Sequence, residues 1–348
     1  MTVFIDDSAW KPQTGLVVKT VDMHTGGEPL RIVTDGLPPI DGSTVLEKRR
    51  FFKENYDFLR TGLMWEPRGH ADMYGAIVTP SNNADFDVFF LHNEGYSTMC
   101  GHAIIALTTL VLEAGLLRRA AKGDENGTSV TFNVPAGRIQ ARAKISAGRV
   151  CDVTFRNVPS FVFLKDGAIE VPGIGRVQFD IAFGGAFYAL VDAHSLGLSL
   201  TPESFIALIE AGRRIKHAIA QAFDVSHPYE KDLSFLYGVI FTGPPLETHH
   251  HSRNVCIFAA GEVDRSATGS GVSARAALHH ARGDLELNRT IVIESILGST
   301  MSVTVTEAVK FGTYDAVVPE VGGSAFVTGR HEFFFDPADP LRRGFIFR

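Results

Sequence analysis

Short apolar runs bounded by Gly, Pro, Asn and Asp recur along the chain, and this pattern is typical of β-strands. Helical spacing is rarer. In 203–222 the apolar residues recur every three or four positions, as on an amphipathic helix. The pattern therefore predicts an α/β (or α+β) protein in which strands outnumber helices. We expect strands at 15–22, 86–91, 129–134, 150–155, 177–182, 255–259, 290–294 and 301–306, and helices at about 102–114, 203–222 and 271–282.

Two of the predicted helices lack a polar face. The segment from His102 to Glu113 is apolar nearly all round, and 273–281 is rich in small residues. A helix without a polar face is a buried helix. We therefore predict that a sheet wraps around one central helix in each half of the chain.

An internal repeat supports two similar halves. Each unit reads as an apolar strand, a polar turn, a helix of about four turns and a terminating Gly. A second echo, Thr25-Gly26-Gly27 against Phe183-Gly184-Gly185, lies about ten residues out of that register, as a loop insertion would produce. A shift of 168 residues aligns 88–94 with 256–262, Cys100 with Thr268, Gly101 with Gly269, Leu110 with Leu278, and Gly115 with Gly283.

The repeat predicts two domains, and a chain of 348 residues is long enough for both. We expect one α/β domain at 1–177, carrying Cys100 and joined by the C-terminal segment 325–348. The other domain spans 178–324 and carries Asp264 and Thr268. A cleft is expected where the two helix N-termini meet.

Composition narrows the class of partner and the compartment. The 33 basic and 39 acidic residues leave a net charge of −6, which argues against nucleic acid and anionic membranes as partners. Three cysteines are too few for a disulfide framework. The most apolar stretch, 103–117, is too short to span a bilayer, and the first seven residues carry no basic n-region. We therefore expect a cytoplasmic protein without membrane contact.

Cys100 is the first candidate for chemistry. It directly precedes a predicted helix, where free N–H groups and the helix dipole favour a thiolate. Gly101 allows a ligand to approach the backbone closely, and His102 adds a donor. The alternative is a buried structural thiol in a capping turn. Cys151 and Cys256 lie inside apolar runs and are interpreted as core residues.

The segment 264–271 is the second candidate. Its glycines and hydroxyls open a helix, which makes a nest of N–H donors suited to a carboxylate or a phosphate. Asp264, four residues before Thr268, is placed to hold a substrate ammonium, although a capped helix start explains the segment equally well. The segment 269–274 formally fits a dinucleotide-binding motif, but a charged turn separates it from the preceding strand, which disfavours that fold.

The histidines suggest no metal site. The adjacent residues His249, His250 and His251 cannot all face one ion from a strand or a helix, and no carboxylate-flanked H-x-x-x-H motif is present, so we expect a loop cluster. His24 and His70 stand in polar turns, where a role in loop hydrogen bonding is favoured over a place in the cleft.

Five motifs, in one order and spread over most of the chain, together resemble the proline racemase family. The resemblance implies a diaminopimelate-epimerase-like fold with two pseudo-symmetric α/β domains and the active site in the cleft between them. It also implies a catalytic residue at the start of each central helix, with no metal and no organic cofactor. Homodimers are common in this family, so a homodimer is expected. The motifs are Met23–Pro29, Met99–His102, Asp180–Gly185, Ser252–Val255 and Asp264–Gly271.

One position departs from the family's racemases and 4-hydroxyproline epimerases, which carry cysteine at both helix starts. Here the second position is Thr268, which resembles the trans-3-hydroxy-L-proline dehydratase branch. The resemblance implies that Cys100 removes the Cα proton and that Asp264 pairs with the ring ammonium of the substrate. The substrate carboxylate would be held by the backbone amides of Gly101, His102, Gly269 and Ser270.

The departure makes chemical sense, because a racemase needs an acid/base on each face of Cα and a threonine hydroxyl is too weakly acidic. In trans-3-hydroxy-L-proline the hydroxyl and the Cα hydrogen share one face, so a single thiolate at Cys100 can carry a syn elimination of water. The thiolate takes the Cα proton, and the resulting thiol is then placed to protonate the departing hydroxide. The enamine would tautomerise to Δ1-pyrroline-2-carboxylate. Two alternatives stay open: a proline or 4-hydroxyproline 2-epimerase in which Thr268 or a nearby group relays a proton, and a non-catalytic imino-acid-binding protein.

Overall fold

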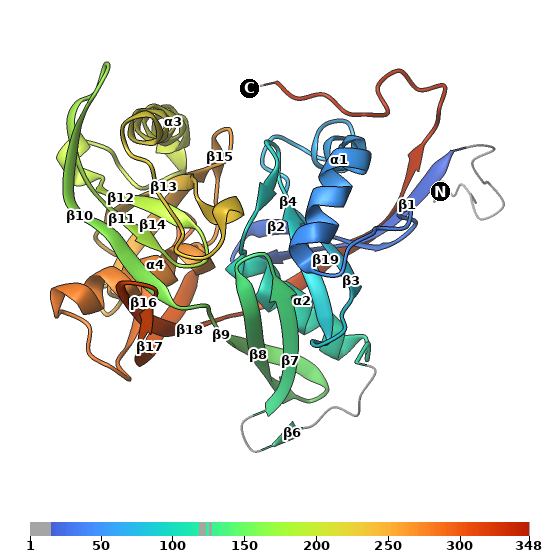
Figure 1. Cartoon of the computed structure of the whole chain (residues 1–348), viewed down its shortest axis with the longest axis horizontal. Coiled ribbons are helices and arrows are strands. Elements are labelled where there is room, and N and C mark those ends of the chain that lie inside the picture. Colours follow the sequence, from blue (N-terminus) through green and yellow to red (C-terminus); the bar gives the residue numbers. More distant parts are fainter. Residues whose placement is uncertain (1–14, 118–122, 125–126, 348) are drawn as a thin grey trace, which may run out of the picture.

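The computed structural model describes residues 15–117, 123–124 and 127–347, so the chain start that was examined for a signal segment lies outside them. Four α-helices occur in this part of the chain, with strands and short 3-10 turns between them (Figure 1). The helices are α1 (Val45–Met64), α2 (Gly101–Glu113), α3 (Phe205–Ala222) and α4 (Gly269–Arg282), and the 3-10 turns are η1 (His194–Leu196), η2 (Pro202–Ser204) and η3 (Lys231–Leu233).

The strands of the described residues form one mixed, mainly antiparallel sheet system. In the first half they are β1 (Leu16–Thr25), β2 (Glu28–Asp35), β3 (Gly75–Pro80), β4 (Phe86–Leu91), β5 (Tyr96–Ser97), β6 (Gly123–Asp124), β7 (Gly127–Val134), β8 (Gly137–Ser146) and β9 (Arg149–Arg156). Those that follow are β10 (Ser160–Val171), β11 (Gly175–Phe183), β12 (Phe187–Asp192), β13 (Leu236–Gly243), β14 (Ser252–Phe258), β15 (Glu262–Val263), β16 (Thr290–Glu294), β17 (Thr300–Phe311), β18 (Tyr314–Gly323) and β19 (Ala325–Phe335).

The predicted α/β class is confirmed. Each of the eight predicted strand runs coincides with an observed strand to within a few residues, and α2, α3 and α4 match the three predicted helices equally well. The two helices without a polar face are the buried ones: every residue of α2 from Gly101 to Val111 is buried, as is every residue of α4 from Gly269 to Leu278. Helix α2 is apolar nearly all round, and the small residues of α4 allow strands to pack closely around it, so both helices are stable inside.

Each central helix is surrounded by strands of its own half (Figure 1). Helix α2 packs on β1, β2, β8, β9 and β19, and α4 packs on β10, β11, β12 and β17. Strand β18 contacts both helices; it pairs with β17 along one edge and with β10 and β9 at successive parts of the other edge. The chain then returns to the first half, where β19 pairs antiparallel with β1. The domain boundary between residues 177 and 178 stays a prediction. Strand β10 ends before this boundary, and it pairs with β11, which crosses the boundary.

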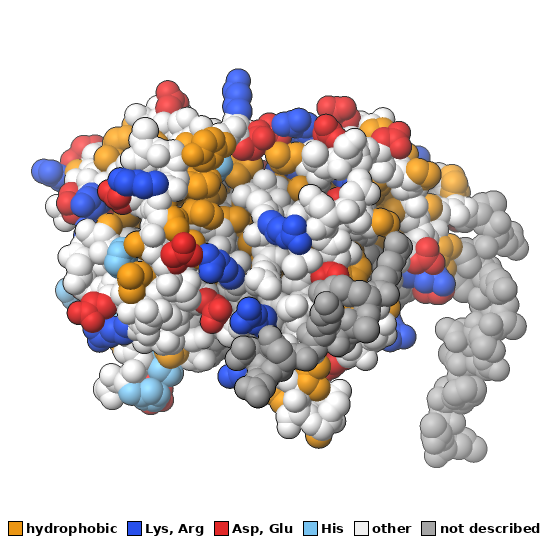
Figure 2. All heavy atoms as spheres, turned by 60° about the horizontal axis from the view of Figure 1, so that its bottom comes forward, with side chains coloured by type: hydrophobic (Ala, Val, Ile, Leu, Met, Phe, Trp, Pro, Cys, Tyr) orange, Lys and Arg blue, Asp and Glu red, His pale blue; other side chains and the backbone are white. Residues whose placement is uncertain are grey.

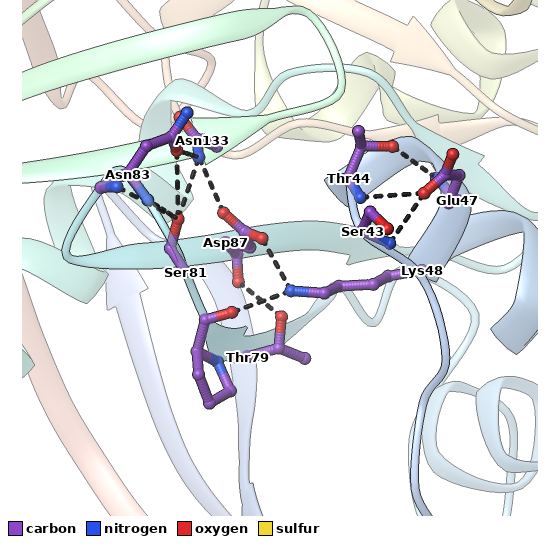
Figure 3. A network of polar contacts seen from close by, with 11 residues as sticks. Ser43, Thr44, Glu47, Lys48, Thr79, Ser81, Asn83, Asp87 and Asn133 are labelled. Carbon is purple, nitrogen blue, oxygen red and sulfur yellow. Dashed lines mark hydrogen bonds and ion pairs between the residues drawn. The ribbon is translucent and has the colours of Figure 1, made fainter.

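Helix α1 was not predicted, and the expectation of only three helices is wrong. A capping box starts it: Thr44 Oγ1 accepts from the Glu47 N–H at 3.2 Å, and Glu47 Oε2 accepts from the Thr44 N–H at 3.1 Å. Lys48 then ties the helix to the sheet, donating to Asp87 Oδ2 at 2.7 Å and to the Pro80 carbonyl at 2.8 Å (Figure 3). Its apolar face joins a second core cluster that includes Phe52.

The position of α1 extends the internal repeat. Helices α1 and α3 end at Met64 and Ala222, which are 158 residues apart, the same separation as between Gly26 and Gly184. The shift therefore changes from 158 to 168 between α3 and β14, where the second half carries about ten extra residues. The two halves thus share a glycine-rich hairpin, an outer helix and a central helix in the same order.

The surface carries both signs of charge. Figure 2 shows acidic and basic side chains interspersed over one face, as the balanced composition leads us to expect. Among the described helices, none combines the length and the apolar character that crossing a membrane requires.

The two central helices meet at their N-termini through backbone atoms. A Cβ added to Gly101 would lie 2.6 Å from the Gly269 Cα, and one added to Gly269 would lie 2.6 Å from the Gly101 Cα. Side chains at either position would force the helices apart, so only glycine permits this approach. Gly184 closes on the same point, since a Cβ there would lie 2.1 Å from the Ser270 carbonyl oxygen.

We expect Gly101→Ala to lower the free energy of unfolding by about 1–3 kcal/mol, because the added methyl overpacks a backbone contact. Urea unfolding followed by fluorescence measures this. The matched control is Gly95→Ala, since a Cβ at Gly95 would meet nothing within 4 Å and its φ is not in the left-handed region. Equal stabilities of the two variants would mean that the helix ends are not in contact.

Candidate active site

A cavity opens where α2 and α4 meet. All seven site residues predicted from the sequence line it, and they come from both halves of the chain. The free volume is about 20 Å³, which is room for about one water molecule, so the lining must move apart to admit a five-membered ring. The lining residues are Tyr74, Met99, Cys100, Gly101, His102, Tyr188, Tyr237, Cys256, Phe258, Asp264, Thr268, Gly269 and Ser270.

Cys100 is the N-cap residue of α2. Its Sγ accepts a hydrogen bond from the Ala103 N–H at 3.4 Å and lies 3.1 Å from His102 Nδ1. Burial lowers the pKa of His102 to about 3, although a hydrogen bond to the Pro29 carbonyl opposes the shift. The imidazole beside the thiol is therefore neutral near pH 7.

Burial raises the pKa of the Cys100 thiol well above its ordinary value. The Ala103 N–H and the Tyr74 hydroxyl lower it, but the negative charges of Asp264 and Glu28 raise it further. Desolvation of the sulfur therefore opposes the thiolate that a helix start favours.

Thr268 is the N-cap residue of α4, and its backbone is strained. Its φ of 67° and ψ of 95° lie where β-branched residues are rarely found, and such strain tends to occur at functional sites. The turn is held because Ser266 Oγ accepts from the Thr268 N–H at 3.1 Å and the Thr268 carbonyl accepts from the Val272 N–H at 2.7 Å. The buried Thr268 hydroxyl lies close to Asp264 and Cys256, where it opposes the rise in the pKa of both groups.

Asp264 is a buried carboxylate without an ion pair among the described residues. It accepts the Ser266 N–H at 2.7 Å, and burial raises its pKa. Neither nearby arginine neutralises it in an ion pair: Arg265 pairs with Asp72 at 2.6 Å, and Arg275 binds hydroxyl and amide side chains of β14. A buried carboxylate in this position suits a cationic ligand.

The cavity can also bind a negatively charged group. The first N–H groups of a helix have no acceptor within it, and the first turns of α2 and α4 both line the cavity. The amides at Gly101, His102, Gly269 and Ser270 are therefore placed where two positive helix ends converge on an anion. Together with Asp264, the cavity is complementary to a small zwitterion.

Sequence reasoning missed six lining residues: Met99, Phe258 and four that carry a hydroxyl or a thiol, Tyr74, Tyr188, Tyr237 and Cys256. All four lie in or beside apolar strand runs, which suggest core positions, and Cys256 is indeed fully buried. One signal was present. Tyr74-Gly75 and Tyr237-Gly238 precede equivalent runs of aliphatic residues in β3 and β13, so the repeat marks two of these tyrosines as a pair.

The other histidines considered in the sequence do not line the cavity: His24 lies at the end of β1, and His70 and the triplet at 249–251 lie in loops. His24 Nδ1 accepts from the Gly27 N–H at 3.2 Å, and His70 Nδ1 accepts from the Asp72 N–H at 3.2 Å. The triplet at 249–251 lies between β13 and β14, where His250 contacts Glu294 at 2.8 Å. These contacts are loop hydrogen bonds of the kind that the sequence favoured.

Comparison with known proteins gives consistent matches over nearly the whole chain. The family model for proline racemase matches residues 20–346. A trans-3-hydroxy-L-proline dehydratase of Colwellia psychrerythraea is 54% identical over 345 residues, covering 97% of this chain and 96% of that protein. The human trans-3-hydroxy-L-proline dehydratase is 44% identical over 337 residues, covering 95% of each chain.

A solved structure shares the fold. The crystal structure of a hydroxyproline epimerase from Agrobacterium vitis, with bound trans-4-hydroxy-L-proline, superposes with a TM-score of 0.88 at 32% identity. The match covers 95% of this chain and 96% of the epimerase.

The raised pKa of Cys100 predicts how its alkylation depends on pH. Only the thiolate reacts, so the iodoacetamide rate at Cys100 should rise roughly tenfold per pH unit from pH 7 and show no plateau below about pH 9. Peptide mass spectrometry resolves Cys100 from the exposed Cys151, which serves as the internal reference. A Cys100 rate that levels off below pH 8 would contradict the raised pKa.

Proposed function

The chain belongs to the proline racemase family, and we propose that within it this protein is a trans-3-hydroxy-L-proline dehydratase. The observation that carries the proposal is the unequal pair at the two helix starts: a thiol at Cys100 and a hydroxyl at Thr268. Both residues line one cavity with Asp264, in a chain 54% identical to a protein of that name.

The unequal pair favours elimination over inversion. Inversion at Cα needs a proton donor on the face opposite the base, and a threonine hydroxyl holds its proton too strongly for that task. Elimination of water from trans-3-hydroxy-L-proline needs chemistry on one face only, because the Cα hydrogen and the 3-hydroxyl lie on the same side of the ring.

The proposed substrate pose uses both charges of the imino acid. Its carboxylate lies between the helix N-termini, where the backbone amides offset the negative charge that grows as Cα loses its proton. Its ring ammonium lies against Asp264. The ammonium then cancels part of the negative field with which Asp264 raises the pKa of Cys100. Substrate binding itself thus favours the thiolate.

In the proposed reaction the Cys100 thiolate takes the Cα proton, and the C3–O bond breaks as the C2–C3 double bond forms. The hydroxide leaves as water after gaining a proton. The enamine product tautomerises to Δ1-pyrroline-2-carboxylate. Every proton transfer in this scheme uses side chains of this chain or solvent, so the proposal includes no metal and no organic cofactor.

We also propose a fold type, a cellular compartment and an oligomeric state for this enzyme. The fold is of the diaminopimelate-epimerase-like type, in which two pseudo-symmetric domains close on the substrate, and the small volume of the cavity is what a closed arrangement would give. The enzyme acts in the cytoplasm. Its functional form is a homodimer.

One observation favours a 2-epimerase of proline or 4-hydroxyproline as the second candidate. Cys256 places another thiol in the cavity, close enough to Thr268 for a hydrogen bond between them to lower the pKa of Cys256. Burial nevertheless raises that pKa well above its ordinary value, so this thiol holds its proton. An epimerase would need Cys256 or Thr268 to supply a proton to the second face of Cα.

Proton NMR in D2O tests the proposal directly. Of trans-3-hydroxy-L-proline, trans-4-hydroxy-L-proline and L-proline, the enzyme should consume only the first, and Cys100→Ser should lower that rate at least about a hundredfold. Cys151→Ser, at an exposed position outside the cavity, is the matched control and should retain activity. Deuterium entering Cα of trans-4-hydroxy-L-proline with inversion would establish the epimerase instead.

Thr268→Cys should add slow Cα inversion of L-proline or trans-4-hydroxy-L-proline to the dehydratase activity. The new thiol would sit at the second helix start and could protonate the face opposite Cys100, and cysteine relieves the β-branched strain at φ 67°. The gain is expected to be small, because a misplacement of about 1 Å can cost a hundredfold in rate. Polarimetry over long incubations measures it.

The control for this variant is Cys100→Ser/Thr268→Cys, which should invert neither substrate. A folded Thr268→Cys protein that shows neither inversion nor Cα deuterium exchange would mean that residue 268 does not face the substrate.

A further inference from the structure

The departing hydroxide must be protonated on the same face from which Cys100 removes the Cα proton, and the Cys100 thiol is not the only donor near that face. Three tyrosines line the cavity. The Tyr188 hydroxyl hydrogen-bonds Ser270 Oγ at 2.7 Å, at the start of α4. The Tyr74 ring lies instead at the start of α2, where it packs edge-on against His102, whose Nδ1 is 3.1 Å from Cys100 Sγ.

The Tyr74 ring is fixed in place. It is 2% exposed and meets the His102 ring edge-on at 4.9 Å between centroids and the Phe258 ring at 6.0 Å. Its hydroxyl hydrogen-bonds the buried Ser97 Oγ, and the Tyr237 hydroxyl is close enough to oppose the rise in the pKa of Tyr74. A rigid ring therefore holds one acidic O–H beside the reacting thiol, with two further hydroxyls able to stabilise the phenolate oxygen.

On the basis of the proposed dehydratase function, we propose that Tyr74 is the catalytic residue that donates the proton to the departing 3-hydroxide. Cys100 defines the face of the ring on which chemistry occurs, and the 3-hydroxyl lies on that face. A donor that packs beside Cys100 and His102 is therefore within reach of the leaving group, whereas the Tyr188 hydroxyl lies at the other helix start.

The steps balance in atoms and electrons. The Cα–H bond breaks and an S–H bond forms on Cys100, while the electron pair of Cα–H forms the C2–C3 double bond. The C3–O bond breaks with its electron pair going to oxygen, which takes the Tyr74 proton and leaves as water. The Tyr74 phenolate then regains a proton from the Cys100 thiol in the same cavity, and the thiolate is restored. Burial raises the pKa of Tyr74, which keeps the donor protonated before the step.

The test separates loss of the leaving group from loss of the Cα proton. In D2O, Tyr74→Phe should lower dehydration of trans-3-hydroxy-L-proline about a hundredfold or more, while deuterium now enters Cα of the recovered substrate. trans-3-Fluoro-L-proline supplies the second readout, because fluoride departs without first being protonated. In Tyr74→Phe, the fold-loss in the elimination rate of the fluoro substrate should be less than a tenth of the fold-loss measured for the hydroxyl substrate.

Two variants control for the loss of a tyrosine hydroxyl. Tyr229→Phe removes an exposed hydroxyl far from the site and should behave as wild type. Tyr237→Phe removes the pseudo-equivalent hydroxyl in the same cavity and should not produce Cα exchange without elimination. If Tyr74→Phe fails to fold, Ser97→Ala/Tyr74→Phe removes both hydrogen-bonding groups, leaves no unpaired Ser97 hydroxyl, and should show the same readouts.

Equal losses on the hydroxyl and fluoro substrates, without Cα exchange, would assign Tyr74 to structure and overturn the inference. The inference would also be overturned if Tyr237→Phe showed the same Cα exchange and the same difference between the hydroxyl and fluoro substrates. A wild-type enzyme that leaves trans-3-hydroxy-L-proline intact would overturn the proposed function itself. If the wild type dehydrates this substrate and Tyr74→Phe does so equally well, only the inference about Tyr74 is overturned.

Discussion

Two helix N-termini touch at Gly101 and Gly269, with no side chain between the backbones. Both helices are buried along most of their length, so the positive ends of two macrodipoles converge in a medium that screens them poorly. Like ends repel unless an anion lies between them. The contact therefore creates both the cleft and its preference for a carboxylate, and the surrounding sheets, which bury the helices, hold the ends together.

Buried acids balance that positive field and tune the thiol. Glu28 is fully buried, and one of its oxygens accepts the Arg265 N–H at 2.7 Å. Burial and the charge of Asp264 raise the pKa of Glu28, because neighbouring negative charges inside the protein repel each other. The same crowding raises the pKa of Cys100. A zwitterion relieves it, because its ammonium offsets the acids while its carboxylate meets the helix ends.

The strands and the two central helices could be predicted because their apolar patterns survive folding almost unchanged. Helix α1 could not be read from that pattern, since charged residues interrupt its apolar face, although the 158-residue shift from α3 marks its position. The cleft residues could be predicted because helix starts carry free N–H groups wherever they lie. The hydroxyl of Tyr74 and the pKa of Cys100 could not, because both depend on neighbours brought in from distant segments.

Pseudo-symmetry of the backbone does not make the two helix starts equivalent. Cys100 has an extended backbone, with φ −144°, and its side chain caps its own helix, whereas Thr268 has φ 67° and its side chain does not cap α4. The tyrosines differ in the same way, since Tyr74 hydrogen-bonds Ser97, before the first N-cap residue, and Tyr188 hydrogen-bonds Ser270, after the second. The two helix starts can therefore support one-sided chemistry, because their N-cap residues have different conformations and different neighbours.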